Sequence, residues 1–528
     1  MPAHGTPPER LNFAHATLER NAARGDKPAY IDDLEALSYR ELDLRVRAAA
    51  AAYVALGVRR EERVLLCLQD TVDFPVAFLG ALYAGVVPVA VNTLLTADDY
   101  AYMLAHSRAQ ALLVSGALLP TLQQALSRGG HDVKHLIVSR AVSSAAVSLD
   151  SALDFAHWRS APSPMAMPAD TGADEMAFWL YSSGSTGRPK GTVHTHANLH
   201  WTSELYGTPV MGVTVNDVVF SAAKLFFAYG LGNALTFPLA VGATTILMAE
   251  RATPQAVFQR LVERRPTIFC GVPTLYAAML ASPALPARSN VALRRCVSAG
   301  EALPREVGER FAAHFGCEVL DGIGSTEMLH IFLSNLPGDV HYGTTGKPVP
   351  GYDIELRGED GKPVEDGVIG DLYVRGPSAA LMYWASRERS RATFQGEWTK
   401  SGDKYTRGND GYYTYAGRSD DMLKVSGQYV SPFEVEAALM RHDAVQEAAV
   451  VGKIGDDGLT RTLAFVVLKS GRGGDAQLAQ ALQAFVKDQL APYKYPREIR
   501  FLPELPKTAT GKIQRFKLRE GAASLKAP

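Results

Sequence analysis

The most informative segment of the 528-residue sequence is a run of hydroxyl residues and glycines at residues 181 to 191, YSSGSTGRPKG. Glycines let a backbone approach a polyanion and adopt positive φ, and closely spaced N–H groups can cradle phosphate oxygens. Hydroxyl groups donate further hydrogen bonds, and a lysine adds a cation. The segment therefore predicts a phosphate-binding loop. Its candidate ligands are Ser182, Ser183, Gly184, Thr186, Gly187 and Lys190.

This loop differs from a Walker A motif. That motif places Gly directly before its Lys and Ser or Thr directly after it, whereas Pro189 precedes and Gly191 follows Lys190 here. We therefore do not expect a standard P-loop NTPase. The other alternative is a flexible turn rich in Gly and Ser, but such a turn does not explain a Pro-Lys-Gly sequence directly behind two pairs of hydroxyl residue and glycine.

Five further motifs follow the loop: SAGEALP at 298 to 304, GIGSTE at 322 to 327, SGD at 401 to 403, GRSDD at 417 to 421 and PKTATGKIQR at 506 to 515. In this order they resemble the adenylate-forming superfamily, which includes acyl-CoA synthetases, firefly luciferase and peptide-synthetase adenylation domains. The resemblance implies a two-step reaction. A carboxylate attacks the α-phosphorus of ATP to give acyl-AMP and pyrophosphate, and the thiol of coenzyme A then displaces AMP.

The resemblance also implies roles for single residues. Lys512 matches the adenylation lysine, and cations near the phosphorus oxygens stabilise the charge that accumulates during attack. Glu327 matches the Mg²⁺ ligand, and Thr326 the contact to the α-phosphate. Asp403 and Arg418 match the residues that bind the ribose. Residues that match the adenine-binding positions are Gly300, Glu301, Ala302 and Asp321.

One rigid site cannot easily serve both steps, and the family solves this with a moving C-terminal domain. The resemblance implies an N-terminal domain of residues 1–419 that binds AMP and the acid, and a mobile domain of residues 420–528 with its hinge at Asp420. Lys512 then serves adenylation, and Gly427 lies on the CoA side during thioester formation. Two residues depart from the family pattern: Ile323 stands where an aromatic residue is common, and Gln428 where a basic residue is common.

The acid is indicated by residues 224 to 233, KLFFAYGLGN, which contain no carboxylate to pair with an amino group. Bulky Phe227 and Tyr229 around small Ala228 predict a short, flat, apolar slot that suits a ring. This stretch and residues 328 to 332, MLHIF, resemble the benzoate–CoA ligases. Positions that match the aryl pocket of that group are Ala228, Tyr229, Ala299, Gly324, Leu329 and His330. His330 is either a core histidine or a polar group near the carboxylate.

The elements around these motifs follow from the apolar pattern. Short Val/Leu/Ile/Ala runs at 63 to 68, 111 to 114 and 135 to 138 alternate with helical segments, which predicts parallel sheets with crossover helices. Strand runs and Gly turns between residues 342 and 415 predict a mostly β region, and a small α+β domain follows. We expect an α/β fold with two doubly wound sheets, a distorted β-barrel and a small mobile α+β C-terminal domain.

Composition limits the remaining possibilities. The 54 Lys and Arg residues balance 55 Asp and Glu residues, so no nucleic-acid partner is expected. The apolar residues 74 to 91 approach the length of a membrane span, but Gly80, Gly85 and Pro88 interrupt them, which predicts a buried helix and strand instead. Four separated cysteines and an N-terminus without an apolar signal segment predict a cytoplasmic protein, with no membrane partner, as a monomer or homodimer.

We therefore expect an ATP-dependent aryl-CoA ligase, with benzoate as the leading acid and Mg²⁺ and coenzyme A as further requirements. A medium-chain or other acyl-CoA synthetase is the alternative within the same enzyme class. A catalytically inactive nucleotide-binding regulatory protein is the alternative from a different class. Formation of AMP that depends on both acid and CoA would distinguish an enzyme from such a regulator.

Overall fold

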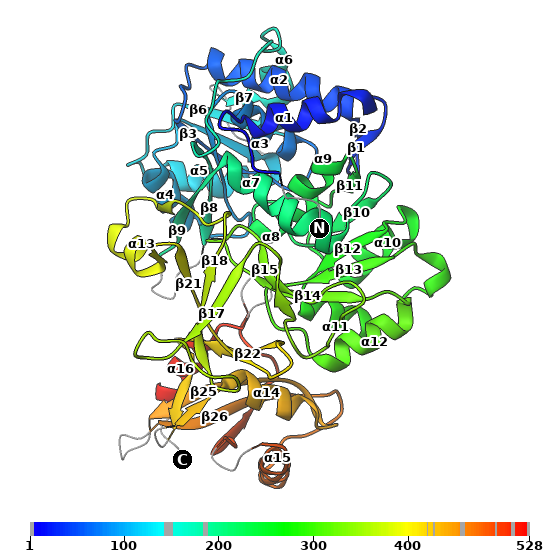
Figure 1. The fold of residues 1–528 in the computed structure, drawn as a ribbon, viewed down its shortest axis with the longest axis vertical. Coiled ribbons are helices and arrows are strands. Elements are labelled where there is room, and N and C mark those ends of the chain that lie inside the picture. The colour runs from blue at the N-terminus through cyan, green and yellow to red at the C-terminus, as the bar shows by residue number, and fades with distance from the viewer. Residues whose placement is uncertain are drawn as a thin grey trace. The chain divides into compact units, whose positions relative to one another are not determined.

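The computed structural model describes residues 5–141, 152–182, 188–419, 421–425, 428–454, 460–490, 494–507 and 513–524. The chain forms two compact units (Figure 1). Unit 1 contains Met1–Ile354 and Tyr373–Ser401, and unit 2 contains Glu355–Leu372 and Gly402–Pro528. The domain boundary that we predict at residue 420 stays a prediction, because Asp420 lies outside the described residues.

The first sheet of unit 1 has nine strands in the order β16-β15-β14-β13-β12-β10-β11-β1-β2. Its central strands are parallel and read as continuous apolar runs, as expected for strands buried on both faces. The strands are β1 Pro28–Ile31, β2 Ala36–Ser38, β10 Val218–Ser221, β11 Thr244–Ile246, β12 Ile268–Gly271, β13 Arg295–Ser298, β14 Val319–Gly324, β15 Ile331–Ser334 and β16 Lys347–Pro348. Helices α10 (Pro254–Glu263), α11 (Pro273–Ala281) and α12 (Arg305–Phe315) connect its strands.

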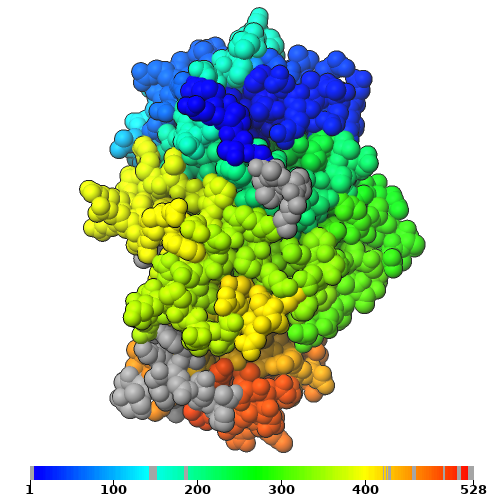
Figure 2. Space-filling view, viewed as in Figure 1, coloured from blue at the N-terminus to red at the C-terminus, as the bar shows by residue number. Residues whose placement is uncertain are grey.

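The second sheet of unit 1 has eight strands in the order β19-β9-β8-β4-β3-β5-β6-β7. They are β3 Arg63–Cys67, β4 Val87–Ala90, β5 Ala111–Ser115, β6 His135–Ser139, β7 Ala152–Asp154, β8 Met176–Ser182, β9 Lys190–Thr195 and β19 Met382–Tyr383. Helices α2 (Tyr39–Ala55), α3 (Asp73–Tyr83), α4 (Ala97–Ser107) and α5 (Leu119–Leu126) accompany it. In Figure 2 the blue and cyan surface belongs mainly to this half of unit 1, and the green surface to the other half.

The apolar residues 74 to 91 form α3 and then β4, as their glycine and proline breaks predict. Every residue of α3 is buried, because the helix contributes to the large apolar core of unit 1 together with α2. Among the described residues, no helix combines the length and the apolar character that crossing a membrane would require.

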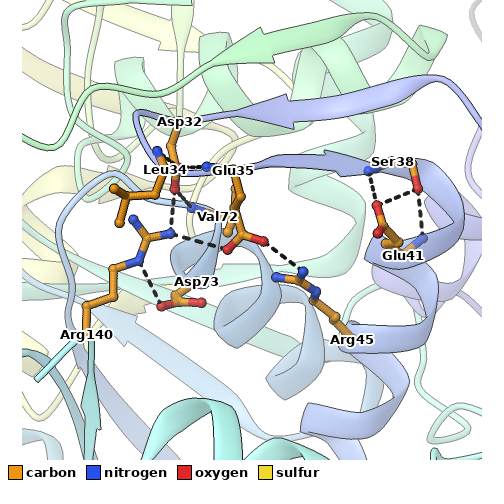
Figure 3. A network of polar contacts seen from close by, with 9 residues as sticks. All are labelled: Asp32, Leu34, Glu35, Ser38, Glu41, Arg45, Val72, Asp73 and Arg140. Carbon is orange, nitrogen blue, oxygen red and sulfur yellow. Dashed lines mark hydrogen bonds and ion pairs between the residues drawn. The ribbon is translucent and has the colours of Figure 1, made fainter.

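A polar network links the two sheets (Figure 3). Arg140, directly after β6, donates from Nη2 to Asp32 Oδ2 at 2.6 Å. Its Nε atom lies 3.5 Å from Oδ2 of Asp73 at the start of α3. Burial alone would raise the pKa of Asp32, but N–H donors, including that of Val72, and the charge of Arg140 lower it. The network therefore fixes the turn after β1 against the segment that joins β3 to α3.

Helix α2 begins beside this network in a capping box. Ser38 Oγ accepts from Glu41 N, and Glu41 Oε2 accepts from Ser38 N at 2.8 Å (Figure 3). Such caps satisfy backbone donors that the first turn of a helix leaves without partners, and each is typically worth about 1 kcal/mol. The S-x-x-E pattern in the sequence thus marks the start of the helix.

An antiparallel β region follows, as the sequence predicts. Its sheet has the order β17-β18-β21-β20, and β22 pairs with β21. The strands are β17 Asp353–Arg357, β18 Gly370–Arg375, β20 Phe394–Gln395, β21 Trp398–Arg407 and β22 Tyr413–Arg418. The register of β21 and β22 places Asp403 opposite Arg418.

The C-terminal part of unit 2 is a small α+β structure. A three-stranded sheet contains β25 (Val445–Ile454), β26 (Thr460–Leu468) and β27 (Glu498–Phe501), and β23 (Leu423–Val425) pairs with β24 (Gln428–Val430). Alternate residues of β25 belong to two different apolar clusters, so both sheet faces are covered. The helices are α14 Pro432–Met440, α15 Ala476–Gln489 and α16 Arg515–Ser524. The predicted fold class is confirmed.

Candidate active site

The described flanks of the phosphate-loop segment form a hairpin of two paired strands. Strands β8 and β9 are antiparallel, and their register pairs Ser182 with Lys190 on either side of residues 183–187. Ser183, Gly184, Thr186 and Gly187 lie outside the described residues. Helix α4 supports both flanks of the loop: Tyr102 Oη donates to Pro189 O at 3.2 Å, and His106 Nδ1 lies 2.8 Å from Tyr181 Oη.

A carboxylate and an ammonium group meet at the base of this hairpin. Glu327 Oε1 accepts hydrogen bonds from Tyr383 Oη at 2.7 Å and from Ser182 Oγ at 3.3 Å. Lys190 Nζ donates to Tyr383 Oη at 3.1 Å and lies 3.9 Å from Glu327 Oε1. Strands β8, β9 and β19 and the segment after β14 therefore bring together the residue types that bind a metal and a phosphate.

The main chain around Glu327 is held at three successive carbonyl groups. His194 Nε2 donates to Thr326 O at 2.7 Å, and Ala380 N donates to Glu327 O at 2.8 Å. Ser378 Oγ donates to Met328 O at 2.8 Å. These bonds fix the segment after β14, so the direction in which the Thr326 and Glu327 side chains leave the backbone is set by β9 and by the residues before β19.

The protonation of His194 follows from its partners. Asn198 Nδ2 lies 2.8 Å from Nδ1, which assigns Nδ1 as the acceptor and Nε2 as the N–H donor to Thr326 O. Burial lowers the pKa of His194 to about 4, so the ring is neutral near pH 7. Asn198 also contacts Ser378 O at 3.0 Å, which ties both supports of the segment together.

The predicted adenine-binding residues lie at the carboxyl ends of two neighbouring parallel strands. β13 ends at Ser298, which pairs with Asp321 of β14, and residues 299 to 302 follow β13. Ends of parallel strands are where α/β proteins place their ligands. Burial raises the pKa of Asp321 to about 8, although Leu303 N donates to its Oδ2 at 3.3 Å. The contact of Gly300, Glu301, Ala302 and Asp321 with adenine stays a prediction.

The predicted acid-pocket residues lie around His330. Tyr229, in α8 (Ala228–Leu231), has its ring centroid 5.7 Å from that of His330, and Phe237 and Tyr206 lie at 4.5 and 5.0 Å. Neither ring nitrogen of His330 makes a hydrogen bond to the described residues. Burial lowers the pKa of His330 to about 3, so this ring is neutral as well. The site thus offers neutral polar nitrogens within aromatic walls.

The other pocket candidates lie on the same elements. Phe227 is the N-cap residue of α8, with its ring 4.5 Å from that of Phe226, and Ala228 is the first residue of the helix. Ala299 is buried directly after β13, Gly324 ends β14, and Leu329 has a positive φ of 65° next to His330. Their contact with the acid stays a prediction.

The predicted ribose-binding pair lies in unit 2. Arg418 Nη1 donates to Asp403 Oδ1 at 3.2 Å across the β21–β22 pair. Gly402 has φ of +81°, and a Cβ atom there would come within 2.9 Å of the guanidinium of Arg418, so glycine leaves room for the pair. Asp420, Gly427 and Lys512 lie outside the described residues, so their predicted roles as hinge, CoA-side residue and adenylation lysine stay predictions.

The donor set at Glu327 suits Mg²⁺. In the described part of the chain, no three His, Cys, Asp or Glu side chains come together as a metal site, and Glu327 is the one carboxylate that the sequence predicts as a ligand. Mg²⁺ is commonly held by one or two carboxylates together with substrate phosphates and water. The position of Glu327 beside the phosphate-loop hairpin fits this arrangement.

Comparison with known proteins identifies the family. The model of the AMP-binding enzyme family matches residues 18–384, and the model of the AMP-binding enzyme C-terminal domain matches residues 434–512. The chain belongs to the AMP-binding enzyme family. The predicted superfamily is therefore confirmed, and ATP and CoA are the co-substrates that this family of CoA ligases implies.

This AMP-binding enzyme is similar to three proteins over nearly its whole length. It is 57% identical to the benzoate–CoA ligase of Thauera aromatica, over 97% of this chain and 96% of that protein. It is 48% identical to the 4-hydroxybenzoate–CoA/benzoate–CoA ligase of Rhodopseudomonas palustris, over 96% and 94%. A crystal structure of a benzoate CoA ligase from Burkholderia xenovorans LB400 is 63% identical, with a TM-score of 0.90, and the match covers 96% of this chain and 100% of that one.

Three supporting residues were not predicted from the sequence: Tyr383, His194 and Asn198. Tyr383 lies 193 residues from Lys190, and His194 lies 132 residues from Thr326. The one local signal is that His194 and Asn198 closely follow the phosphate-loop motif, at the end of β9 and in α7 (His196–Thr202).

Proposed function

We propose that this AMP-binding enzyme is an ATP-dependent benzoate–CoA ligase. It converts benzoate, or a close aryl carboxylate, to the CoA thioester through an acyl-adenylate and releases AMP and pyrophosphate. The observation that carries the proposal is identity of 57% and 63% to benzoate–CoA ligases over nearly the whole chain. The free, buried state of all four cysteines suits the cytoplasm, where we place the enzyme as a monomer or homodimer.

Adenylation requires charge stabilisation where the carboxylate attacks the α-phosphorus. Mg²⁺ held by Glu327 would neutralise phosphate charge in the bound substrate. Lys190 contributes an ammonium from the phosphate-loop hairpin, and Thr326 contributes a hydroxyl group to the α-phosphate. The three fixed carbonyls of residues 326 to 328 keep these groups in place before the substrate arrives. Such preorganisation favours the transition state because it costs no reorientation during the reaction.

The acid pocket selects a flat, apolar acid. The rings of Tyr229, Phe237 and Tyr206 surround His330, and a Cβ atom at Gly232 would come within 2.4 Å of His330 Cδ2. A ring fills such a short space better than a flexible chain does. Residues 224 to 233 offer no acid for an amino group, which argues against amino-acid substrates.

Thioester formation follows when the C-terminal domain of residues 420–528 has turned about Asp420. In this proposal Lys512 leaves the reacting phosphorus and Gly427 comes to the CoA side. The thiolate of CoA attacks the acyl carbon of benzoyl-AMP, the acyl–phosphate bond breaks, and AMP leaves. Asp403 and Arg418 bind the ribose in both steps.

A panel of acids tests the proposal. Purified enzyme is given ATP, Mg²⁺ and CoA with benzoate, 3- and 4-hydroxybenzoate, or medium-chain fatty acids, and AMP and thioester are measured separately. We expect benzoate to give the highest kcat/KM, with AMP and thioester formed in equal amounts. Preference for a medium-chain acid would favour the other acyl-CoA synthetases. Absence of pyrophosphate exchange with every acid would favour an inactive nucleotide-binding protein.

A further inference from the structure

Asp70 is a fully buried carboxyl group that none of these steps uses. It lies three residues after β3, and its side chain reaches the segment that leads into α8. Its Oδ1 and Oδ2 atoms lie 3.2 and 3.3 Å from Leu225 N, and both accept from that N–H group. A residue that follows a strand of the eight-stranded sheet thus holds a segment that follows β10 of the nine-stranded sheet.

Backbone hydrogen bonds connect the residues of the segment that Asp70 holds. Phe227 N donates to Lys224 O at 3.0 Å, and Leu231 N donates to Phe227 O at 2.7 Å. A Cβ atom at Gly230 would lie 2.0 Å from Lys224 O, so the first turn of α8 lies directly against the residues before it. A displacement of Leu225 would therefore displace Phe227 and the turn that carries Tyr229.

A partly buried cation, Lys224, lies near Asp70. Burial lowers the pKa of Lys224, and its attraction to Asp70 raises it. Lys224 Nζ donates to Glu250 O at 2.7 Å and to Met248 O. Beyond it, Arg260 Nη1 lies 2.6 Å from Glu250 Oε1, and Arg260 Nη2 lies 2.7 Å from Asp33 Oδ1. The other charged groups around Asp70 and Lys224 are therefore Glu250, Arg260 and Asp33.

The backbone that carries Asp70 is itself fixed. Two residues further on, Val72 N donates to Asp32 Oδ2 at 3.0 Å, and Arg140 Nη2 donates to the same oxygen atom at 2.6 Å (Figure 3). Asp70 is therefore a rigid anchor for the Leu225 segment, because Asp32 keeps the chain after β3 in place.

We propose that Asp70 is a positioning residue of the acid pocket: as a carboxylate it holds the Leu225 N–H and so fixes the turn of Phe227 and Tyr229. This inference rests on the proposed aryl-CoA ligase function. Protonation of Asp70 weakens its hold on Leu225, because a neutral carboxyl group accepts a hydrogen bond less strongly than a carboxylate does.

The hold depends on pH in a range that is easy to measure. Burial raises the pKa of Asp70 to about 6, while Lys224 and the Leu225 N–H lower it. Asp70 is therefore ionised above about pH 6 and neutral below it. The KM for benzoate is expected to rise as the pH falls through this value, while the KM for ATP changes much less.

The test compares Asp70→Asn with Asp73→Asn. Asp73 is a buried carboxyl group three residues further along, and it contacts Ser139 and Arg140 instead of the Leu225 segment. We measure benzoate-dependent pyrophosphate exchange from about pH 5 to about pH 8. Asp70→Asn is expected to raise the KM for benzoate about tenfold at high pH and to abolish its rise near pH 6. Asp73→Asn is expected to keep the wild-type profile.

Hydrogen exchange provides a second measurement that needs no activity. Amide exchange at residues 224 to 231 is expected to be faster in Asp70→Asn than in both Asp73→Asn and the wild type. Unchanged exchange there, or equal changes in the KM for benzoate and for ATP, would overturn the positioning role. If the wild type activates a different acid, the proposed function fails, and the same comparison with that acid still decides the role of Asp70.

Discussion

Tyr383 Oη donates a hydrogen bond of 2.7 Å to Glu327 Oε1, and Tyr383 Oη itself accepts a hydrogen bond from Lys190 Nζ at 3.1 Å. The phenol therefore connects the Glu327 carboxylate, the predicted Mg²⁺ ligand, with the cation of the phosphate-loop hairpin. The Lys190 ammonium also lies 4.3 Å from the centre of the Tyr383 ring. Since both partners are charged, this hydroxyl group orients them more firmly than a neutral contact would.

Replacing Tyr383 by Phe should impair the use of Mg·ATP. The substitution keeps the ring but removes the hydroxyl group that orients Glu327. A hydrogen bond to a charged group is worth about 1.5–3 kcal/mol, so we expect adenylation to fall roughly tenfold to a hundredfold. The Mg²⁺ concentration required for half-maximal pyrophosphate exchange should rise, and thioester formation from supplied benzoyl-AMP should change little.

Tyr39→Phe is the matched control, because Tyr39 is a buried tyrosine whose hydroxyl group donates to Ala243 O and contacts neither Glu327 nor Lys190. It should leave the Mg²⁺ dependence unchanged. An equal loss in both half-reactions for Tyr383→Phe, or a Mg²⁺ dependence like that of the wild type, would contradict the orienting role.

The buried His194 should matter for adenylation although it reaches only a backbone carbonyl. His194→Leu removes one of the two donors to Thr326 O, since Leu329 N also donates to it at 3.2 Å, and the lost hydrogen bond costs about 0.5–1.5 kcal/mol. We expect slower pyrophosphate exchange together with a lower melting temperature. His194→Gln retains an N–H donor and should restore exchange more than stability. If His194→Leu and His194→Gln give the same rate of pyrophosphate exchange, the hydrogen bond to Thr326 O does not position the site.

Much of the fold follows from local signals in the sequence. Continuous apolar runs mark the buried parallel strands, and Gly85, with a positive φ of 70°, separates α3 from β4. Ser38 and Glu41 mark the start of α2 by the spacing of a capping box. The order in which strands join a sheet depends on contacts between distant residues, and the sequence pattern did not specify it.

The site likewise contains residues that the sequence predicts and residues that it does not. Lys190, Glu327 and Asp321 belong to short motifs at strand ends, so their chemistry is visible in the sequence. Tyr383 and His194 reach Glu327 and Thr326 across 56 and 132 residues, and a tyrosine or histidine in a strand looks like any core residue until the strands are paired. Asp70 was missed for the same reason, since its partner Leu225 lies 155 residues away.

Buried histidines should make the fold sensitive to mild acid. Burial lowers the pKa of His194 and His196 to about 4 and that of His330 to about 3, against an ordinary value near 6.5. At these three histidines the unfolded chain binds protons first as the pH falls below about 6.5, so they lower the free energy of unfolding from there down to about pH 4, whereas the raised pKa values of Asp321 and Asp70 act in the opposite direction. Each histidine contributes up to about 1.4 kcal/mol per pH unit in that window.

Urea unfolding at about pH 7 and about pH 5 measures this dependence. His194→Gln should reduce the slope of stability against pH, because glutamine does not titrate. Exposed His157 is the control, and His157→Gln should keep the wild-type slope. A slope that is unchanged in His194→Gln would show that His194 is not held neutral by the fold.

The last prediction separates the two half-reactions at Lys512 and Asp420. Lys512→Ala should lower adenylation by at least about 100-fold, the typical effect of losing one electrostatic stabiliser, while supplied benzoyl-AMP is still converted to thioester. Asp420→Pro should do the opposite, because proline restricts backbone rotation at the hinge and slows only thioester formation. Lys469→Ala, at an exposed lysine of the same domain, should change neither rate. Equal losses in both half-reactions for Lys512→Ala would refute the division of labour, and wild-type rates in Asp420→Pro would move the hinge elsewhere.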